Sequence, residues 1–164
     1  MRAALLALVA CGGHVPAPAP AVANQVPAAQ PAACTKDCMP DLALVDTTGT
    51  KYTRASLAGK TVVVTFWATW CKPCQKQIPA LVKVKAQGAM VIGIVTDTPS
   101  DQDLANFVTD YAIDFPIVRA GSDMLVAWNY PQALPTTFVY GRDGTQVYTH
   151  VGPIADGALD AYLK

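Results

Sequence analysis

The sequence predicts an α/β fold in which helices cover both faces of a central mixed β-sheet. Residues 61–67 and 90–95 are apolar, β-branched runs typical of strands that are buried on both faces. Residues 71–85, which lie between them, carry apolar side chains at helical spacing. Because a strand, a helix and a strand follow in this order, we expect two parallel strands joined by a right-handed crossover.

Turn residues and apolar patterns predict the other elements. Apolar and polar residues alternate on both sides of a turn at residues 47–50, so a small N-terminal β-hairpin opens the domain. After the second buried strand, the chain predicts a helix that carries Leu104, Phe107, Val108 and Tyr111. The remaining predicted elements are an extended stretch at 115–118, a short helix at 123–128, a hairpin of strands 136–140 and 145–151, and a closing helix at 155–163.

Composition excludes several classes of function. The 164 residues contain twelve basic and twelve acidic side chains, so no overall positive field attracts nucleic acid. All twelve acids are aspartate, which excludes any mechanism that needs a glutamate.

The first 39 residues are predicted to form a signal peptide followed by a flexible tether. Residues 1–10 combine one positive charge with a short apolar run, the layout of a secretory signal, and about 20 apolar residues would be needed to cross a membrane. Residues 8–11 resemble the lipobox of bacterial lipoproteins, so Cys11 is the expected lipidation site; the alternative is an incidental thiol behind an ordinary signal. Residues 11–39 form a tether, rich in proline and alanine, that ends in a CxxxC pair, and residues 40–164 form the domain.

The chemistry is predicted at Trp70-Cys71-Lys72-Pro73-Cys74, between a buried strand and a helix. At a helix N-terminus, backbone N–H groups and the helix dipole stabilise a thiolate, so Cys71 is the expected nucleophile and Cys74 the resolving thiol. Lys72 adds a positive charge that lowers the pKa of Cys71 further, and Pro73 stiffens the turn.

The second pair, Cys34 and Cys38, leaves several interpretations open. In an oxidising compartment two thiols this close are expected to form a small disulfide. The alternatives are a second redox pair that exchanges with Cys71 and Cys74, or a soft site for Cu(I). A zinc site built from both pairs is disfavoured, because Cys34 and Cys38 precede the domain and no histidine lies close in sequence. We therefore assign no metal ligands.

Several motifs in order resemble one protein family. They are Phe66-Trp67-Ala68-Thr69-Trp70 before the cysteine pair, Leu134-Pro135-Thr136-Thr137-Phe138, Gly141-Arg142-Asp143-Gly144 and His150-Val151-Gly152. Together they resemble the thioredoxin superfamily, and more closely its branch of exported, membrane-tethered TlpA/ResA-like thiol-disulfide oxidoreductases. The resemblance implies a thioredoxin-like fold, a cis peptide bond at Pro135 that faces the cysteines, and pairing of the Leu134 backbone with an extended substrate chain.

Two positions depart from this family pattern. Thioredoxin carries a buried aspartate where this chain has Thr65, and ResA-like proteins often carry a glutamate where it has Gln77. A buried carboxylate raises a thiol pKa and can carry the proton of the resolving thiol. We therefore predict that Cys74 exchanges its proton with water or substrate.

The expected function is that of a lipid-anchored, extracytoplasmic thiol-disulfide oxidoreductase of the bacterial periplasm, without a cofactor. The resemblance favours reduction of disulfides in apocytochrome c or in copper-site assembly proteins, with an upstream membrane thiol reductant as electron source. The alternatives are a copper-binding chaperone and a thiol peroxidase. A peroxidase is disfavoured because its threonine three residues, and its proline seven residues, before the reactive cysteine are missing here.

Overall fold

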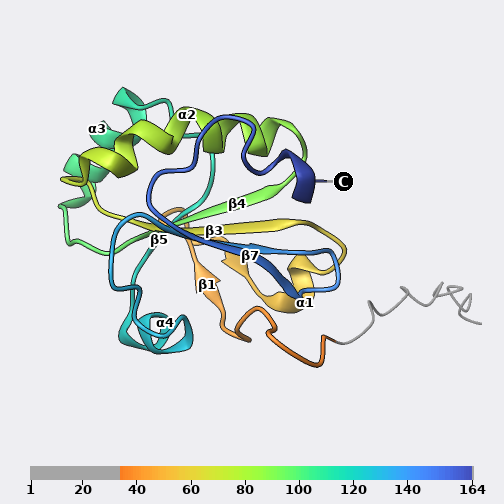
Figure 1. Cartoon of the computed structure of the whole chain (residues 1–164). Coiled ribbons are helices and arrows are strands. Elements are labelled where there is room, and N and C mark those ends of the chain that lie inside the picture. The colour runs from red at the N-terminus through yellow and green to blue at the C-terminus, as the bar shows by residue number, and fades with distance from the viewer. Residues whose placement is uncertain (1–33, 164) are drawn as a thin grey trace, which may run out of the picture.

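The computed structural model describes residues 34–163. Its centre is a five-stranded mixed sheet in the order β5-β4-β3-β6-β7 (Figure 1). Strand β3 pairs in parallel with β4 and antiparallel with β6, which confirms the predicted fold class. The bounds are β3 (Val62–Trp67), β4 (Met90–Val95), β5 (Ile117–Arg119), β6 (Thr136–Tyr140) and β7 (Gln146–Val151).

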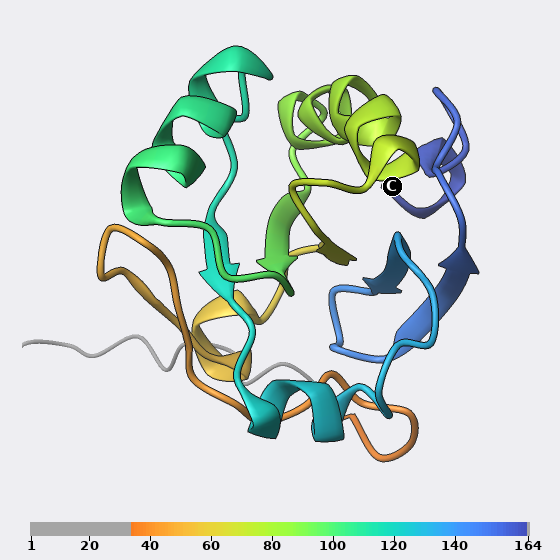
Figure 2. The ribbon, with the colours of Figure 1, turned by 90° about the vertical axis from the view of Figure 1, so that its left-hand side faces the viewer.

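Helices cover both faces of this sheet. Helices α2 (Lys72–Ala86) and α3 (Asp101–Asp110) lie on one side, and α1 (Arg54–Leu57) and α4 (Ser122–Ala127) on the other (Figures 1 and 2). All six side chains of β3 are buried, because successive side chains of a strand point to opposite faces and each face has its own apolar cluster. The central strand therefore holds the two layers together.

The predicted N-terminal hairpin is present as β1 (Leu44–Val45) and β2 (Lys51–Tyr52). Asp46 in its turn accepts hydrogen bonds from Thr48, Thr50 and Tyr52. Burial alone would raise the pKa of Asp46, but these hydrogen bonds outweigh it and lower the pKa. A bridge between Asp46 and Val118 fixes the hairpin to the edge of the main sheet.

The prediction of a closing helix over residues 155–163 is wrong. The segment contains only a short 3-10 helix, η1 (Asp160–Tyr162). Gly157 adopts a φ of 77°, a left-handed conformation that interrupts a right-handed helix. Leu159 is nevertheless fully buried and packs in the cluster beneath α2, so the segment covers the sheet without being an α-helix.

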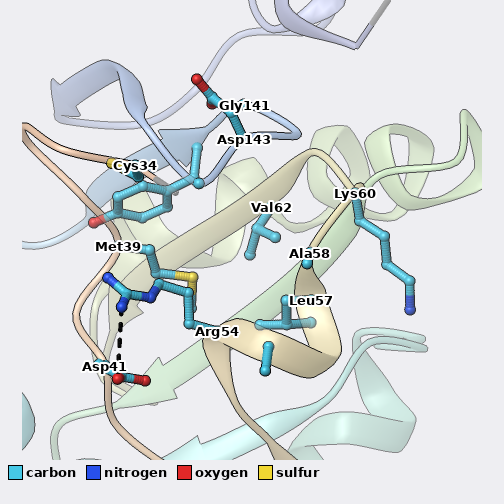
Figure 3. Close-up of a pocket in the computed structure, with 13 residues that line it drawn as sticks. Cys34, Met39, Asp41, Arg54, Leu57, Ala58, Lys60, Val62, Gly141 and Asp143 are labelled. Atoms are coloured by element: carbon cyan, nitrogen blue, oxygen red, sulfur yellow. Dashed lines mark ion pairs between the residues drawn. The ribbon is translucent and has the colours of Figure 1, made fainter. Parts of the chain in front are cut away.

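The folded body begins slightly before residue 40. Cys38 forms a β-bridge with Thr145, and the Met39 N–H donates to the Gly144 carbonyl at 2.9 Å. Figure 3 shows Met39 beside the Arg54–Asp41 ion pair, whose N–O distance is 3.6 Å. Because the Met39 side chain is buried in the core, the end of the expected tether is part of the domain.

The expected signal peptide and the lipidation site Cys11 lie outside the described residues. Within residues 34–163, no helix is both long and apolar enough to cross a membrane.

Candidate active site

Cys71 and Cys74 lie at the junction between the end of β3 and the start of α2. Cys71 is the N-cap residue of the helix, and its sulfur accepts a hydrogen bond from the Cys74 N–H at 3.3 Å. The two cysteines form a disulfide with their Cα atoms 5.2 Å apart, and both are buried. Pro73 fits the first turn because an N–H at that point has no partner inside the helix. The helix start thus holds both sulfurs in a tight, N–H-rich turn.

An open groove runs beside the cysteine pair. It is lined by residues 70–73 on one side and residues 131–134 on the other. The Leu134–Pro135 peptide bond is cis, and the Pro135 carbonyl accepts a hydrogen bond from the Gly152 N–H of the segment after β7. Trp70 is 69% exposed, an unusual exposure for so large an apolar side chain, and it stands at the rim of the groove.

The Asp97 carboxylate, which was not among the predicted site residues, holds the loop segment just before the cysteines. Asp97 accepts hydrogen bonds from the Thr69 N–H, at 3.2 Å, and from the Thr69 hydroxyl. The Gln75 side chain donates to the Thr69 carbonyl at 2.8 Å, so every polar group of Thr69 has a partner. The position of Asp97, two residues after the end of the buried strand β4, is the signal that could have pointed to it.

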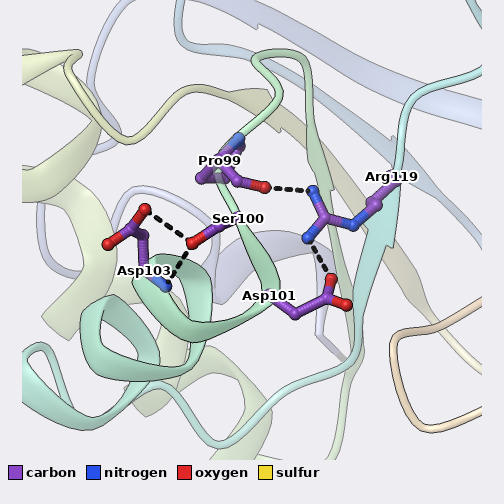
Figure 4. Close-up of polar contacts among 5 residues, drawn as sticks. All are labelled: Pro99, Ser100, Asp101, Asp103 and Arg119. Atoms are coloured by element: carbon purple, nitrogen blue, oxygen red, sulfur yellow. Dashed lines mark hydrogen bonds and ion pairs between the residues drawn. The ribbon is translucent and has the colours of Figure 1, made fainter.

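The loop that carries Asp97 is itself fixed at the start of α3 (Figure 4). Arg119 donates to the Pro99 carbonyl at 3.0 Å and to the Asp101 carboxylate at 2.7 Å. Ser100 caps α3, accepting from the Asp103 N–H at 3.1 Å and donating to the Asp103 carboxylate at 2.6 Å. These contacts connect the edge strand β5, through the loop, to Asp97.

We predict that Asp97→Ala lowers the free energy of unfolding by about 1–3 kcal/mol, because the Thr69 N–H and hydroxyl lose a charged acceptor. Urea unfolding measures the change. Asp143→Ala is a matched control, since Asp143 accepts the same two kinds of hydrogen bond from Thr145 in an exposed turn. The control should lose less stability; an equal loss in both variants would contradict the prediction.

The two positions that depart from the family pattern form a neutral network beneath the cysteines. Gln77, which is 1% exposed, donates to the Thr65 hydroxyl at 3.0 Å and accepts from the Ile154 N–H at 3.1 Å. The Thr65 hydroxyl also lies 3.0 Å from the Thr137 hydroxyl. Because these side chains satisfy one another, the site is stable without a carboxylate.

Cys34 and Cys38 form the second disulfide, with their Cα atoms 5.7 Å apart. The Thr145 hydroxyl donates to the Cys34 sulfur at 3.5 Å, which places the pair at the β6–β7 turn. That turn lies beside the start of β3, because Tyr140 pairs with Val62, whereas the active site follows the end of β3. At about 3.3 Å per residue, the strand alone separates the two pairs by roughly 17 Å.

We predict that replacing both Cys34 and Cys38 with serine leaves the rate of disulfide exchange unchanged within about twofold, because the two pairs cannot meet in one molecule. Loss of so small a loop should lower the free energy of unfolding by up to about 2 kcal/mol. Steady-state reduction of a peptide disulfide measures the rate. A large loss of activity at unchanged stability would show instead that the second pair takes part in exchange.

No group of three or more histidine, cysteine or aspartate side chains is placed to hold a metal ion in the part of the chain that the structure describes. A buried CxxC at a helix start, opposite a cis-proline in a thioredoxin-like fold, defines the class of thiol-disulfide oxidoreductases.

Comparisons with known proteins agree with this class. Residues 35–149 match the model of the AhpC/TSA family. The thiol-disulfide oxidoreductase ResA of Bacillus thuringiensis (strain Al Hakam) is 33% identical over 129 residues, which cover 76% of this chain and 74% of that protein. The chain belongs to the AhpC/TSA family, and it is a thiol-disulfide oxidoreductase similar to ResA.

Solved structures show the same fold. A putative thiol:disulfide interchange protein DsbE from Chlorobium tepidum is 27% identical, with a TM-score of 0.65 over 77% of this chain and 92% of that one. A secreted Mycobacterium tuberculosis disulfide oxidoreductase, homologous to E. coli DsbE, is 27% identical, with a TM-score of 0.61 over 74% of this chain and 90% of that one.

Proposed function

We propose that the protein reduces disulfides of extracytoplasmic client proteins, with Cys71 as nucleophile and Cys74 as resolving thiol. The observation that carries this proposal is the placement of Cys71 at the N-cap of α2, beside an open groove that ends at the cis peptide bond of Leu134 and Pro135. A client segment in this groove would bring its disulfide next to Cys71, and its backbone next to Leu134.

The exchange has two steps. The Cys71 thiolate attacks one sulfur of the client disulfide, which forms a mixed disulfide and releases the other client sulfur as a thiolate. Cys74 then gives its proton to water or to the client and attacks the Cys71 sulfur as a thiolate, which closes the Cys71–Cys74 disulfide and releases the second client sulfur as a thiolate. Two electrons pass to the client, and its thiolates take up protons from water, because Thr65 and Gln77 offer no acid.

The α2 N-terminus supplies the stabilisation that this chemistry needs. The N–H of Cys74 already points at the Cys71 sulfur, and the partial positive charge of the helix start favours a thiolate at that position. Lys72 is exposed at the first position of the helix and adds a full positive charge. We infer that Trp70, Pro73 and Leu134 shape the groove and that Pro135 fixes its far wall.

We further propose that lipid on Cys11 tethers the protein to a membrane of the bacterial periplasm, where an upstream membrane thiol reductant restores the Cys71–Cys74 dithiol. A relative from Mycobacterium tuberculosis is described as secreted, which agrees with this location. Apocytochrome c and copper-site assembly proteins are the proposed clients. Metabolic labelling with a radioactive fatty acid tests the anchor: label should enter the wild type and not Cys11→Ser.

The reduction potential of the Cys71–Cys74 pair tests the direction. Equilibration with glutathione buffers, followed by alkylation of free thiols, gives the value in the Cys34→Ser/Cys38→Ser background, where one pair titrates alone. We expect a potential near that of thioredoxin, about −270 mV, as a reductant needs. A potential near that of DsbA, about −120 mV, would make the protein an oxidant and overturn the proposed direction.

A further inference from the structure

The lysines of helix α2 differ in whether they form ion pairs with acidic side chains. All four charged residues of α2 are lysines. Lys83 pairs with Asp156 at 2.9 Å and Lys85 with Asp114 at 2.7 Å, at the end of the helix remote from the cysteines. Lys72 and Lys76, in the first two turns, are exposed and take part in no ion pair within residues 34–163.

No acidic side chain lines the groove itself. Lys76 lies beyond it on α2, in a hollow that it shares with Lys83 and Asp156, and Asp156 is paired with Lys83 at 2.9 Å. Lys72 is the one charged residue among the groove-lining residues 70–73 and 131–134. Asp97, on the loop behind Thr69, is engaged by the Thr69 N–H and hydroxyl. The partial positive charge at the start of the 15-residue helix α2 adds to that of the lysines. The groove therefore has a positive rim, although the whole chain has no net charge.

The opposite side of the groove is mostly apolar, with Gln132 as its one polar side chain, and the turn before it is held in place. Tyr130 directly precedes the lining segment, is 52% exposed, and adopts a φ of 47°. Its N–H donates to the Leu125 carbonyl at 2.6 Å, which holds this left-handed turn against the end of α4. Pro131 offers apolar surface across from Lys72, and the exposed Trp70 adds apolar surface on the same side as Lys72.

We propose that the preferred clients are extended, cysteine-bearing segments with acidic residues and an apolar or aromatic residue beside the reactive cysteine. This inference rests on the proposed function and names the class of its substrate. The acidic residues would meet Lys72 and Lys76, and the apolar residue would contact Trp70 and Pro131. Complementary charge at a rim mainly accelerates encounter and lowers KM, since the lysines contact the client rather than the sulfurs that react.

Three disulfide peptides test the proposal. They share one core with the two cysteines and differ only in flanking residues, which are acidic, neutral or basic. With the reduced protein at low salt, kcat/KM should be about threefold higher for each peptide charge that meets a lysine, so with two lysines the acidic peptide should exceed the neutral one about tenfold, and the basic peptide should be the slowest of the three. The preference should shrink at high salt, where exposed charges are screened.

Lys76→Glu and a matched control localise the effect. Lys76→Glu should lower the ratio of kcat/KM for the acidic peptide to that for the basic peptide. This ratio is the readout, because any effect of the new carboxylate on the Cys71 thiolate is common to all three peptides. Lys60→Glu makes the same charge change just before β3, at the end of the strand away from the groove, and should alter none of the three values by more than about twofold. Equal turnover of the acidic and basic peptides, or an equal effect of both variants, would overturn the inference.

The same assay separates this inference from the function on which it rests. If the neutral peptide is reduced at the same rate as the acidic and basic ones, the charge preference fails and the oxidoreductase function stands. If none of the three peptides is reduced, the proposed function fails first.

Discussion

Cys71→Ser abolishes disulfide exchange, lowering kcat/KM by at least about a thousandfold, the order of effect expected when the nucleophile of a covalent mechanism is removed. A serine hydroxyl cannot replace the sulfur, because the reactive species is a thiolate and the first step forms a new S–S bond. Steady-state reduction of a peptide disulfide measures the loss.

Cys74→Ser gives a different result and identifies the order of the two thiols. Cys71 can still attack, but the intermediate has no internal thiol to resolve it, so a mixed disulfide with the client accumulates. Non-reducing electrophoresis followed by mass spectrometry detects this adduct and locates its sulfur on Cys71. An adduct on Cys74 in the Cys71→Ser variant, with none on Cys71 in Cys74→Ser, would reverse the assigned roles.

Gln77→Glu changes both the stability and the pH dependence of the protein. The new carboxylate occupies a site that is 1% exposed, keeps the acceptor for the Ile154 N–H, and loses the amide donor to Thr65. Burial raises the pKa of such a carboxyl group, and once ionised it raises the pKa of the nearby Cys71 thiol by repulsion. At neutral pH, we expect the free energy of unfolding to fall by about 1–3 kcal/mol.

The sign of the pH effect follows from linkage. When folding raises the pKa of a carboxyl group, that group does not lower the free energy of unfolding at a pH below its unfolded pKa of about 4.3. As the pH rises from there through the folded pKa, the group lowers the free energy of unfolding progressively. The deficit of Gln77→Glu against the wild type should therefore be small in acid and large at pH 8. Urea unfolding across this range measures the deficit, and ultraviolet absorbance of the thiolate follows the Cys71 titration in the reduced protein.

Gln77→Met separates charge from hydrogen bonding. It also leaves the Ile154 N–H and the Thr65 hydroxyl without their partner, but it introduces no ionisable group. Its stability deficit should be independent of pH, and its Cys71 titration should match that of the wild type. If Gln77→Glu also leaves the Cys71 titration unchanged, this position does not control the thiol in the way we propose.

Local sequence patterns were sufficient to predict the strands that form the central sheet and most of the helices that cover it. The all-apolar run of β3 predicts a strand buried on both faces, and the structure shows all six of its side chains buried. The prediction was wrong for residues 155–163, where helical spacing of apolar residues competes with the left-handed Gly157, and where Leu159 is buried by tertiary contact alone. Apolar spacing does not tell a helix from an irregular segment that covers the same surface.

The features that the sequence did not predict depend on contacts between segments that are far apart in the chain. Asp97 and Thr69 are 28 residues apart, and their hydrogen bonds depend on the parallel pairing of β3 with β4. Met39 was assigned to the tether because its anchor, the Gly144 carbonyl, belongs to a turn more than a hundred residues later. The sequence singled out Cys71 and Cys74, which form a disulfide in the structure, because their spacing is local. It missed the residues that hold the neighbouring loop, because their partners are distant in sequence.

Both ends of the described residues lie on the side of the molecule away from the Cys71–Cys74 disulfide. The Cys34–Cys38 disulfide sits against the β6–β7 turn, and the Tyr162 carbonyl accepts a hydrogen bond from Thr61, directly before β3, at 3.5 Å. Figure 1 shows the start of the described residues and the C-terminus on the same side of the molecule. An affinity tag, a fluorescent reporter or a linker to a sensor chip could therefore be joined at the C-terminus without obstructing access to Cys71.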